Sequence, residues 1–160
     1  MSLDLSDQTT LNFGDANAPH EVTVITNLAC PFCHKWFENN FDKLTQEVKA
    51  GHLLAHFKFL DKDKLDLQDG NLAHEFIDYA NPEAAIKFVK AAFDNQPEWH
   101  RLPKADAEDY ITSHFDVKRV NSDEFLANVK HNIEELGAPS VPTIIYDGNQ
   151  VSDSNFNLPD

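Results

Sequence analysis

The sequence predicts an α/β fold built around a mixed β-sheet, and three observations support this prediction. The β-branched run Glu21–Thr26 is typical of a central strand. An amphipathic helical pattern from Pro31 to Gly51 follows it, and a second apolar strand pattern covers Leu53–Leu60. Two strands joined by a helix are expected to be parallel. The turn Asp147-Gly148 then indicates an antiparallel hairpin that begins near Val141 and returns at Gln150-Val151.

A block of helices is expected between the second strand and this hairpin. One helix would contain Leu72, Phe76, Ile77 and Tyr79, and a second would start at Asn81-Pro82-Glu83. A third would run from Ala105 to about Phe115, and a fourth from Ser122 to Leu136 with an Asn121–Glu124 capping box and a stop at Gly137. We therefore expect a helical subdomain, residues 67–115, inserted into a domain made of residues 1–66 and 116–160.

Composition and charge limit the classes of partner. The chain has 160 residues, of which 41% are hydrophobic, and this is enough apolar material for a folded core. A net charge of −14, from 13 basic and 27 acidic residues, leaves no basic stripe for nucleic acid or anionic membranes. No apolar stretch reaches the roughly 18 residues of a membrane span. The first residues lack the basic and apolar regions of a secretory signal, so the expected location is the cytoplasm.

The only two cysteines form a Cys30-Pro31-Phe32-Cys33 motif, at the point where a strand meets a helix. The first turn of a helix presents unpaired N–H groups and the positive end of the helix dipole. A thiolate at Cys30 is stabilised there, so the pKa of Cys30 should fall below the ordinary value of about 8.5. Cys33 follows one turn later and can close a disulfide. Cys30 is therefore expected to attack, and Cys33 to resolve the mixed disulfide.

This motif in this context resembles the thioredoxin superfamily, and within it the DsbA-like group of thiol–disulfide oxidoreductases. The resemblance covers residues 12–151 and rests on the CPFC motif, the entry segment 13–19, the distant Val141-Pro142 and the helical insertion. It implies a thioredoxin fold with an inserted helical subdomain, and a cis peptide bond between Val141 and Pro142 in a loop against the cysteines. The resemblance and the position of the side chains suggest a substrate site made of Pro31, Phe32, His34, Val141 and Pro142.

The resemblance also implies the reaction and its participants. The expected activity is disulfide exchange or isomerisation on protein or peptide thiols and disulfides, with glutathione among the small thiols. The dithiol itself carries the two electrons, so neither a dissociable cofactor nor a metal is expected. Oligomeric state and the direction of the reaction in the cell do not follow from the sequence.

Three departures from the DsbA-like pattern bear on reactivity. Val24 stands where many relatives have a buried acid that assists proton transfer to the resolving thiol. Phe32 offers neither a hydrogen bond nor a charge to the Cys30 thiolate, unlike the histidine of strongly oxidising members, so a less oxidising couple is expected. The sequence also ends at Asp160, where the group normally adds a closing helix; absence of that helix and truncation of the sequence are both open.

Several other interpretations of the same residues are open. A glutaredoxin-like, glutathione-dependent reductase and a non-catalytic binding module of the same fold are the main alternatives. Cys30 to His34 also matches the CxxCH pattern of c-type haem attachment. Zinc could use Cys30, Cys33 and His34, but a structural site needs a fourth ligand. The other histidines considered are His52 and His56 on a strand, too far apart to share a metal, and His74, His114 and His131, expected at the surface or partly buried on helices.

Overall fold

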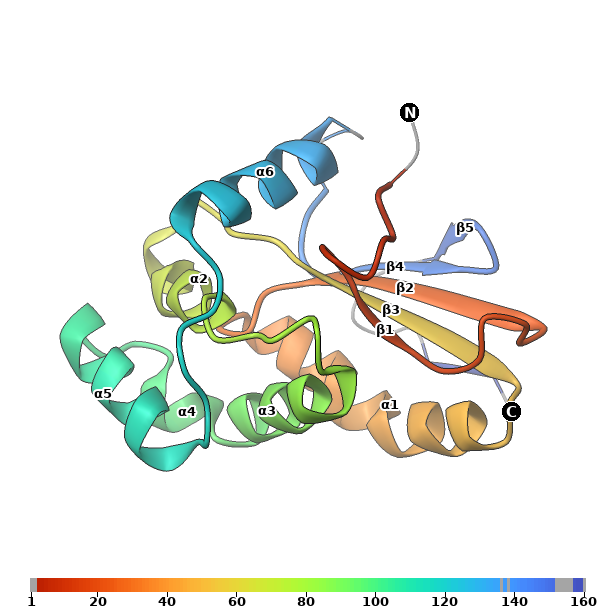
Figure 1. Ribbon diagram of the computed structural model, residues 1–160, viewed down its shortest axis with the longest axis horizontal. Coiled ribbons are helices and arrows are strands. Elements are labelled where there is room, and N and C mark those ends of the chain that lie inside the picture. The colour runs from red at the N-terminus through yellow and green to blue at the C-terminus, as the bar shows by residue number, and fades with distance from the viewer. Residues whose placement is uncertain (1–2, 136, 138, 152–156, 160) are drawn as a thin grey trace.

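A central strand, β2 (His20–Thr26), organises the β-sheet. The computed structural model describes residues 3–135, 137, 139–151 and 157–159. β2 pairs along its whole length with the parallel strand β3 (Leu53–Phe59) and, on its other side, with the antiparallel strand β4 (Thr143–Tyr146). β1 (Leu11–Phe13) and β5 (Asn149–Val151) form the edges, in the order β1-β3-β2-β4-β5 (Figure 1). The predicted mixed sheet is confirmed.

One long helix, α1 (Pro31–Lys49), follows β2 and covers one face of the sheet together with α3 (Pro82–Asp94) (Figure 1). Proline at the first helical position sets the backbone angle for the helix without losing a hydrogen bond. The buried side of α1 carries Trp36, Phe37 and Leu44, at helical spacing. The direction of α1 is therefore fixed by its apolar face, and its first turn lies at the end of β2.

The opposite face of the sheet is covered by α6 (Asp123–Glu134) (Figure 1). Ile25 points to this face and forms a buried cluster with Leu60, Val129 and Ile133. The expected helix is therefore present with the expected apolar residues, although Leu136 lies outside the described residues. Helices on both faces leave the end of β2 as the place where loops from several elements meet.

Four helices and a short 3-10 turn lie between β3 and α6. They are η1 (Leu65–Leu67), α2 (Gln68–His74), α3, α4 (Gln96–Trp99) and α5 (Lys104–His114). Trp99 is fully buried, and its indole Nε1–H donates to the Ala92 carbonyl oxygen at 2.9 Å. The buried residues of these helices join those of the sheet in one hydrophobic cluster. The division into a domain and an inserted subdomain stays a prediction.

Three local expectations were wrong. Leu11–Phe13 forms the edge strand β1, ahead of the first strand that was expected, because three residues give too short a pattern to be recognised. α2 ends at His74 rather than continuing to Tyr79. The predicted capping box is replaced by Ser122, whose hydroxyl accepts the Phe125 N–H. The amide of Asn121 donates instead to the carbonyl oxygens of His74 and Ile77.

The N-terminal segment is fastened to the sheet by a buried lysine. The Lys58 side chain on β3 is fully buried, and its ammonium donates to the Asp4 and Thr9 carbonyl oxygens at 2.7 and 2.9 Å. It also donates to the hydroxyls of Thr9 and Thr10, each at 3.1 Å. Burial lowers the pKa of Lys58 to about 8. Hydrogen bonds to four oxygens offset part of the cost of burying this charge.

The close approach of α2 to the loop after β2 gives a testable prediction. A methyl group at Gly70 would lie 1.9 Å from Asn27 Oδ1 and 2.7 Å from the backbone nitrogen of Ala29. Gly70→Ala is therefore expected to lower the free energy of unfolding by about 3 kcal/mol or more, as measured by denaturant unfolding.

Gly51→Ala is the matched control. Gly51 has a φ of +79° and nothing within 4 Å of the new methyl group, so this change adds only backbone strain, about 1–2 kcal/mol. An equal loss of stability in the two variants would contradict the close packing of α2 on this loop.

Candidate active site

Cys30 lies at the junction between the sheet and α1. Its backbone is extended, with φ −77° and ψ 120°, and it forms the N-cap of α1, directly before Pro31. Cys33 is in the first turn of the helix, and both cysteines are free thiols with little exposed surface. The strand, the proline and the helix together place two thiols one turn apart at a helix N-terminus, as expected.

The first turn of α1 makes Cys30 acidic. Hydrogen bonding from the Cys33 thiol is the largest cause that lowers the pKa of Cys30, to about 6, and the backbone N–H groups of Cys33 and Phe32 add to it. Partial burial and the negative charge of Asp66 oppose this shift. Because the donors stabilise the thiolate more than burial destabilises it, Cys30 is largely ionised at neutral pH.

Cys33 has the opposite character. Burial is the largest cause that raises the pKa of Cys33 well above its ordinary value, and the hydrogen bond and charge of Cys30 raise it further. The Thr26 hydroxyl and the Asn27 backbone lower it by smaller amounts. Val24, at the position of the missing acid, is buried in the apolar core. The pKa of one thiol is thus lowered and that of the other is raised, so Cys30 loses its proton well before Cys33 does.

The loop before β4 lies against Cys30. The Val141–Pro142 peptide bond is cis, and the Cys30 Sγ lies 3.8 Å from the Val141 carbonyl oxygen, to which the protonated thiol donates. Pro142 is buried, Val141 is partly buried, and β4 starts at Thr143. Cys30 and Val141, which are 111 positions apart in the sequence, are therefore in contact through the Cys30 sulfur.

The three remaining candidate residues lie differently. Pro31 and Phe32 are exposed beside Cys30, and the Phe32 side chain keeps 62% of its surface accessible. His34 turns to the side of α1, where it stacks on Phe93 and lies 3.4 Å from the Glu38 carboxylate. The exposed Phe32 can meet a substrate, whereas the described contacts of His34 are with its own helix and α3.

A groove lies between η1 and the segment that joins α4 to α5. It has a volume of about 720 Å³, and its lining includes Leu65, Asp66, His100 and Leu102. Leu65 is 95% exposed, and the Asp66 carboxylate acts on Cys30 electrostatically. The groove lining mixes apolar and charged side chains and includes neither Cys30 nor Cys33.

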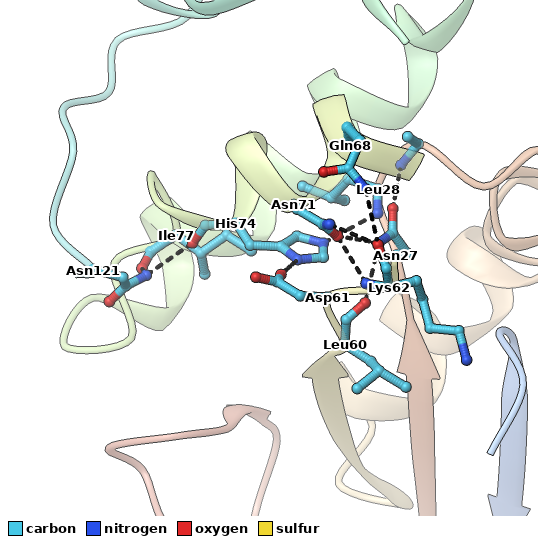
Figure 2. A network of polar contacts seen from close by, with 11 residues as sticks. Asn27, Leu28, Leu60, Asp61, Lys62, Gln68, Asn71, His74, Ile77 and Asn121 are labelled. Carbon is cyan, nitrogen blue, oxygen red and sulfur yellow. Dashed lines mark hydrogen bonds and ion pairs between the residues drawn. The ribbon is translucent and has the colours of Figure 1, made fainter. Parts of the chain in front are cut away.

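The loop that precedes Cys30 is held by side chains that the sequence did not single out (Figure 2). Asn27 accepts the Ala29 N–H through Oδ1 at 2.9 Å, and its amide donates to Leu60 O and Asn71 Oδ1, each at 3.0 Å. Gln96 on α4 donates to the carbonyl oxygens of Leu28 and Cys30. Asn27 could have been suspected from its place just before the motif, but Gln96, 66 residues away, has no local signal.

Neither a cluster of metal ligands nor a membrane-spanning helix is found among the described residues. No three of their His, Cys, Asp or Glu side chains are grouped as the ligands of a metal ion would be. None of the described helices has both the length and the apolar character needed to cross a bilayer.

Comparison with known proteins identifies the family. A family model described as thioredoxin matches residues 6–157. The chain belongs to the thioredoxin family. None of the curated proteins matches it. A solved structure of a conserved protein of unknown function from Enterococcus faecalis V583 is 31% identical, with a TM-score of 0.87, over 96% of this chain and 87% of that chain.

Two more distant structures share the fold of this thioredoxin-family protein. BdbD from Bacillus subtilis is 14% identical, with a TM-score of 0.68, over 93% of this chain and 87% of BdbD. Alpha-DsbA1 from Wolbachia pipientis is 21% identical, with a TM-score of 0.67, over 94% of this chain and 79% of that chain. The predicted thioredoxin fold with additional helices, as in DsbA-like proteins, is confirmed.

The acidity of Cys30 gives the first prediction for this site. In the reduced protein, the rate of alkylation by iodoacetamide should rise with pH around a midpoint near 6, because the helix N–H groups and Cys33 stabilise the thiolate. The measurement is the pH dependence of the rate of modification, with the site identified by mass spectrometry. A midpoint near the ordinary value of about 8.5 would contradict it.

The source of this acidity can be tested with Cys33→Ala. This change removes the largest of the stabilising hydrogen bonds but keeps the backbone donors, so the midpoint for Cys30 should move upward from about 6 and stay below about 8.5. If the midpoint does not move, the Cys33 thiol is not a major donor to Cys30.

Proposed function

We propose that this protein is a thiol–disulfide oxidoreductase that acts on protein or peptide substrates through Cys30 and Cys33. The observation that carries the proposal is the opposite behaviour of the two thiols: the pKa of Cys30 is lowered by the first turn of α1, and the pKa of Cys33 is raised by burial. Thiol–disulfide exchange needs an ionised attacking sulfur and a second, protected thiol within reach.

In the direction of substrate reduction, the Cys30 thiolate attacks one sulfur of a substrate disulfide. A bond forms between that sulfur and Cys30, the substrate disulfide breaks, and one substrate thiolate leaves. Cys33 then loses its proton, which goes to the departing sulfur through solvent, and attacks the Sγ of Cys30. The second substrate thiol is released, and the protein holds a Cys30–Cys33 disulfide. Two electrons pass to the substrate, so no dissociable cofactor is needed.

The surroundings of Cys30 favour an extended peptide as the substrate. The backbone of Val141, which already contacts Cys30 Sγ through its carbonyl oxygen, can pair with a peptide in the manner of an added β-strand. Pro142 offers no N–H and no charge that would compete for the thiolate. Exposed Phe32 and Pro31 supply apolar contact next to the reacting sulfur.

Substrate turnover and a trapped intermediate test this function. The wild-type protein should reduce insulin disulfides with dithiothreitol as the electron source, and Cys30→Ser should abolish this activity because the attacking sulfur is missing. Cys33→Ala should accumulate a mixed disulfide through Cys30, detectable by mass spectrometry, since the resolving thiol is missing. Absence of both turnover and the mixed disulfide would favour a non-catalytic binding module. Turnover only with glutathione would favour a glutaredoxin-like reductase.

The Cys30–Cys33 couple is expected to be a weaker oxidant than DsbA, whose reduction potential is about −120 mV. Phe32 gives the Cys30 thiolate neither a hydrogen bond nor a charge. Phe32→His should therefore raise the reduction potential by about 30 mV or more, which corresponds to about 1.4 kcal/mol of added stability for the dithiol form. The reduction potentials of the wild-type protein and the variant are measured by equilibration with glutathione buffers. A wild-type potential as high as that of DsbA, or no change in the variant, would show that Phe32 does not set the potential.

A further inference from the structure

His74 is a buried histidine with two partners on opposite sides of its ring. It is the last residue of α2, and its side chain has no exposed surface, contrary to the expectation of a surface or partly buried residue. Its Nε2 accepts the backbone N–H of Leu28 at 3.2 Å, and its Nδ1 lies 2.7 Å from Asp61 Oδ1 (Figure 2). No described contact of His74 belongs to the thiol chemistry itself.

These two partners fix the protonation of the ring. A backbone N–H can only donate, so Nε2 must carry a free lone pair toward Leu28. A carboxylate accepts, so the single ring proton lies on Nδ1 toward Asp61. His74 is therefore held as the neutral Nδ1–H tautomer, and its Nε2 is an acceptor aimed at one backbone group.

That backbone group belongs to the loop that delivers Cys30. Leu28 is fully buried and lies two residues before the nucleophile. Its carbonyl oxygen accepts from Gln96, and the following N–H, of Ala29, donates to Asn27. The N–H of Leu28 therefore depends on His74 as its partner. A buried N–H left without a partner costs about 1–3 kcal/mol. Loss of His74 would therefore destabilise the present conformation of the loop and favour its rearrangement.

His74 itself is held from three directions. Its carbonyl oxygen accepts from Asn121, which lies just before α6, and its ring packs against Phe59 at the end of β3. Asp61, directly after that strand, accepts the Nδ1 proton. A ring fixed by β3, α2 and the segment before α6 can serve as a rigid support for the loop.

We propose that His74 is a positioning residue of the active site, which acts through the Leu28 N–H to hold Cys30 over the first turn of α1. The proposal rests on the proposed function for its consequence in turnover. The immediate effect of His74 is on the pKa of Cys30. The thiolate is stabilised by hydrogen-bond donors, and the distances from these donors to the Cys30 sulfur depend on the position of the loop that precedes Cys30.

Two substitutions separate the two contacts of His74. In His74→Gln, the amide oxygen can occupy the place of Nε2 and accept from Leu28. In His74→Asn, the shorter side chain can keep the contact with Asp61 but cannot reach Leu28. The alkylation midpoint of Cys30 should rise by about one pH unit in His74→Asn, a tenfold change in proton affinity, and should stay within about a third of a unit of wild type in His74→Gln.

His56→Asn is the matched control. His56 is also a buried histidine with both ring nitrogens in contact, to Asn12 and Glu21, but it lies on β3 opposite Thr23, away from the active-site loop. This variant should lose stability without moving the Cys30 midpoint. An equal rise in the His56 and His74 variants would mean that general loosening of the fold is responsible, and would overturn the proposal.

A further variant keeps the proposal testable if His74→Asn does not fold. Asp61→Asn replaces the charged acceptor of the Nδ1 proton by a neutral one, and should shift the Cys30 midpoint upward by a smaller amount. An unchanged midpoint in every folded variant of His74 and Asp61 would refute the positioning role. A wild-type Cys30 that titrates near its usual pKa would instead count against the proposed function, so the two failures are distinguishable.

Discussion

The proposed chemistry of this protein depends on the hydrogen bonds that reach Cys30 Sγ from the start of α1. Partial burial alone would make this thiol less acidic, yet the Cys33 thiol and two backbone N–H groups reverse the direction. These donors are available because a helix leaves its first N–H groups without internal partners, and because Pro31 starts the helix at a defined residue. In the proposed reaction, the order of attack by the two thiols follows from that single local arrangement.

The rest of the fold serves to keep that arrangement in one place. β2 is paired on both sides, so its end is fixed, and apolar clusters on both faces of the sheet fix α1 and α6. The helices between β3 and α6 add side chains that hydrogen-bond to the four-residue connection 27–30 between β2 and α1. Asn71 reaches it from α2, and Gln96 reaches it from α4. A loop with few remaining free polar groups has little freedom to move away from the helix.

The sequence predicted what depends on local patterns, and missed what depends on contacts between distant segments. The β-branched strand and the CPFC motif predicted where both thiols lie, at the start of a helix, because strand, cap and helix are encoded within thirty residues. The fold as a whole was recognised only when the distant Val141-Pro142 and the block of helices were added. β1 was missed because three residues carry no periodicity. Gln96 and His74 were missed as supports of the loop, since only the folded chain brings α4 and α2 to residues 27–30. The proline at 142 was recognised by resemblance, and no local rule would have paired it with Cys30.

The buried Lys58 has a consequence for the ends of the molecule. Every oxygen described around its ammonium belongs to residues 4–10, so those residues supply the polar environment of a charge placed inside the sheet. A shortened chain that starts after Thr10 would remove these hydrogen-bond acceptors from Lys58. Because a buried charge without partners is unfavourable, the ammonium group would then be expected to lose its proton. The residues ahead of the first strand keep much of their own surface exposed, yet their oxygens complete the polar environment of a buried side chain of the sheet.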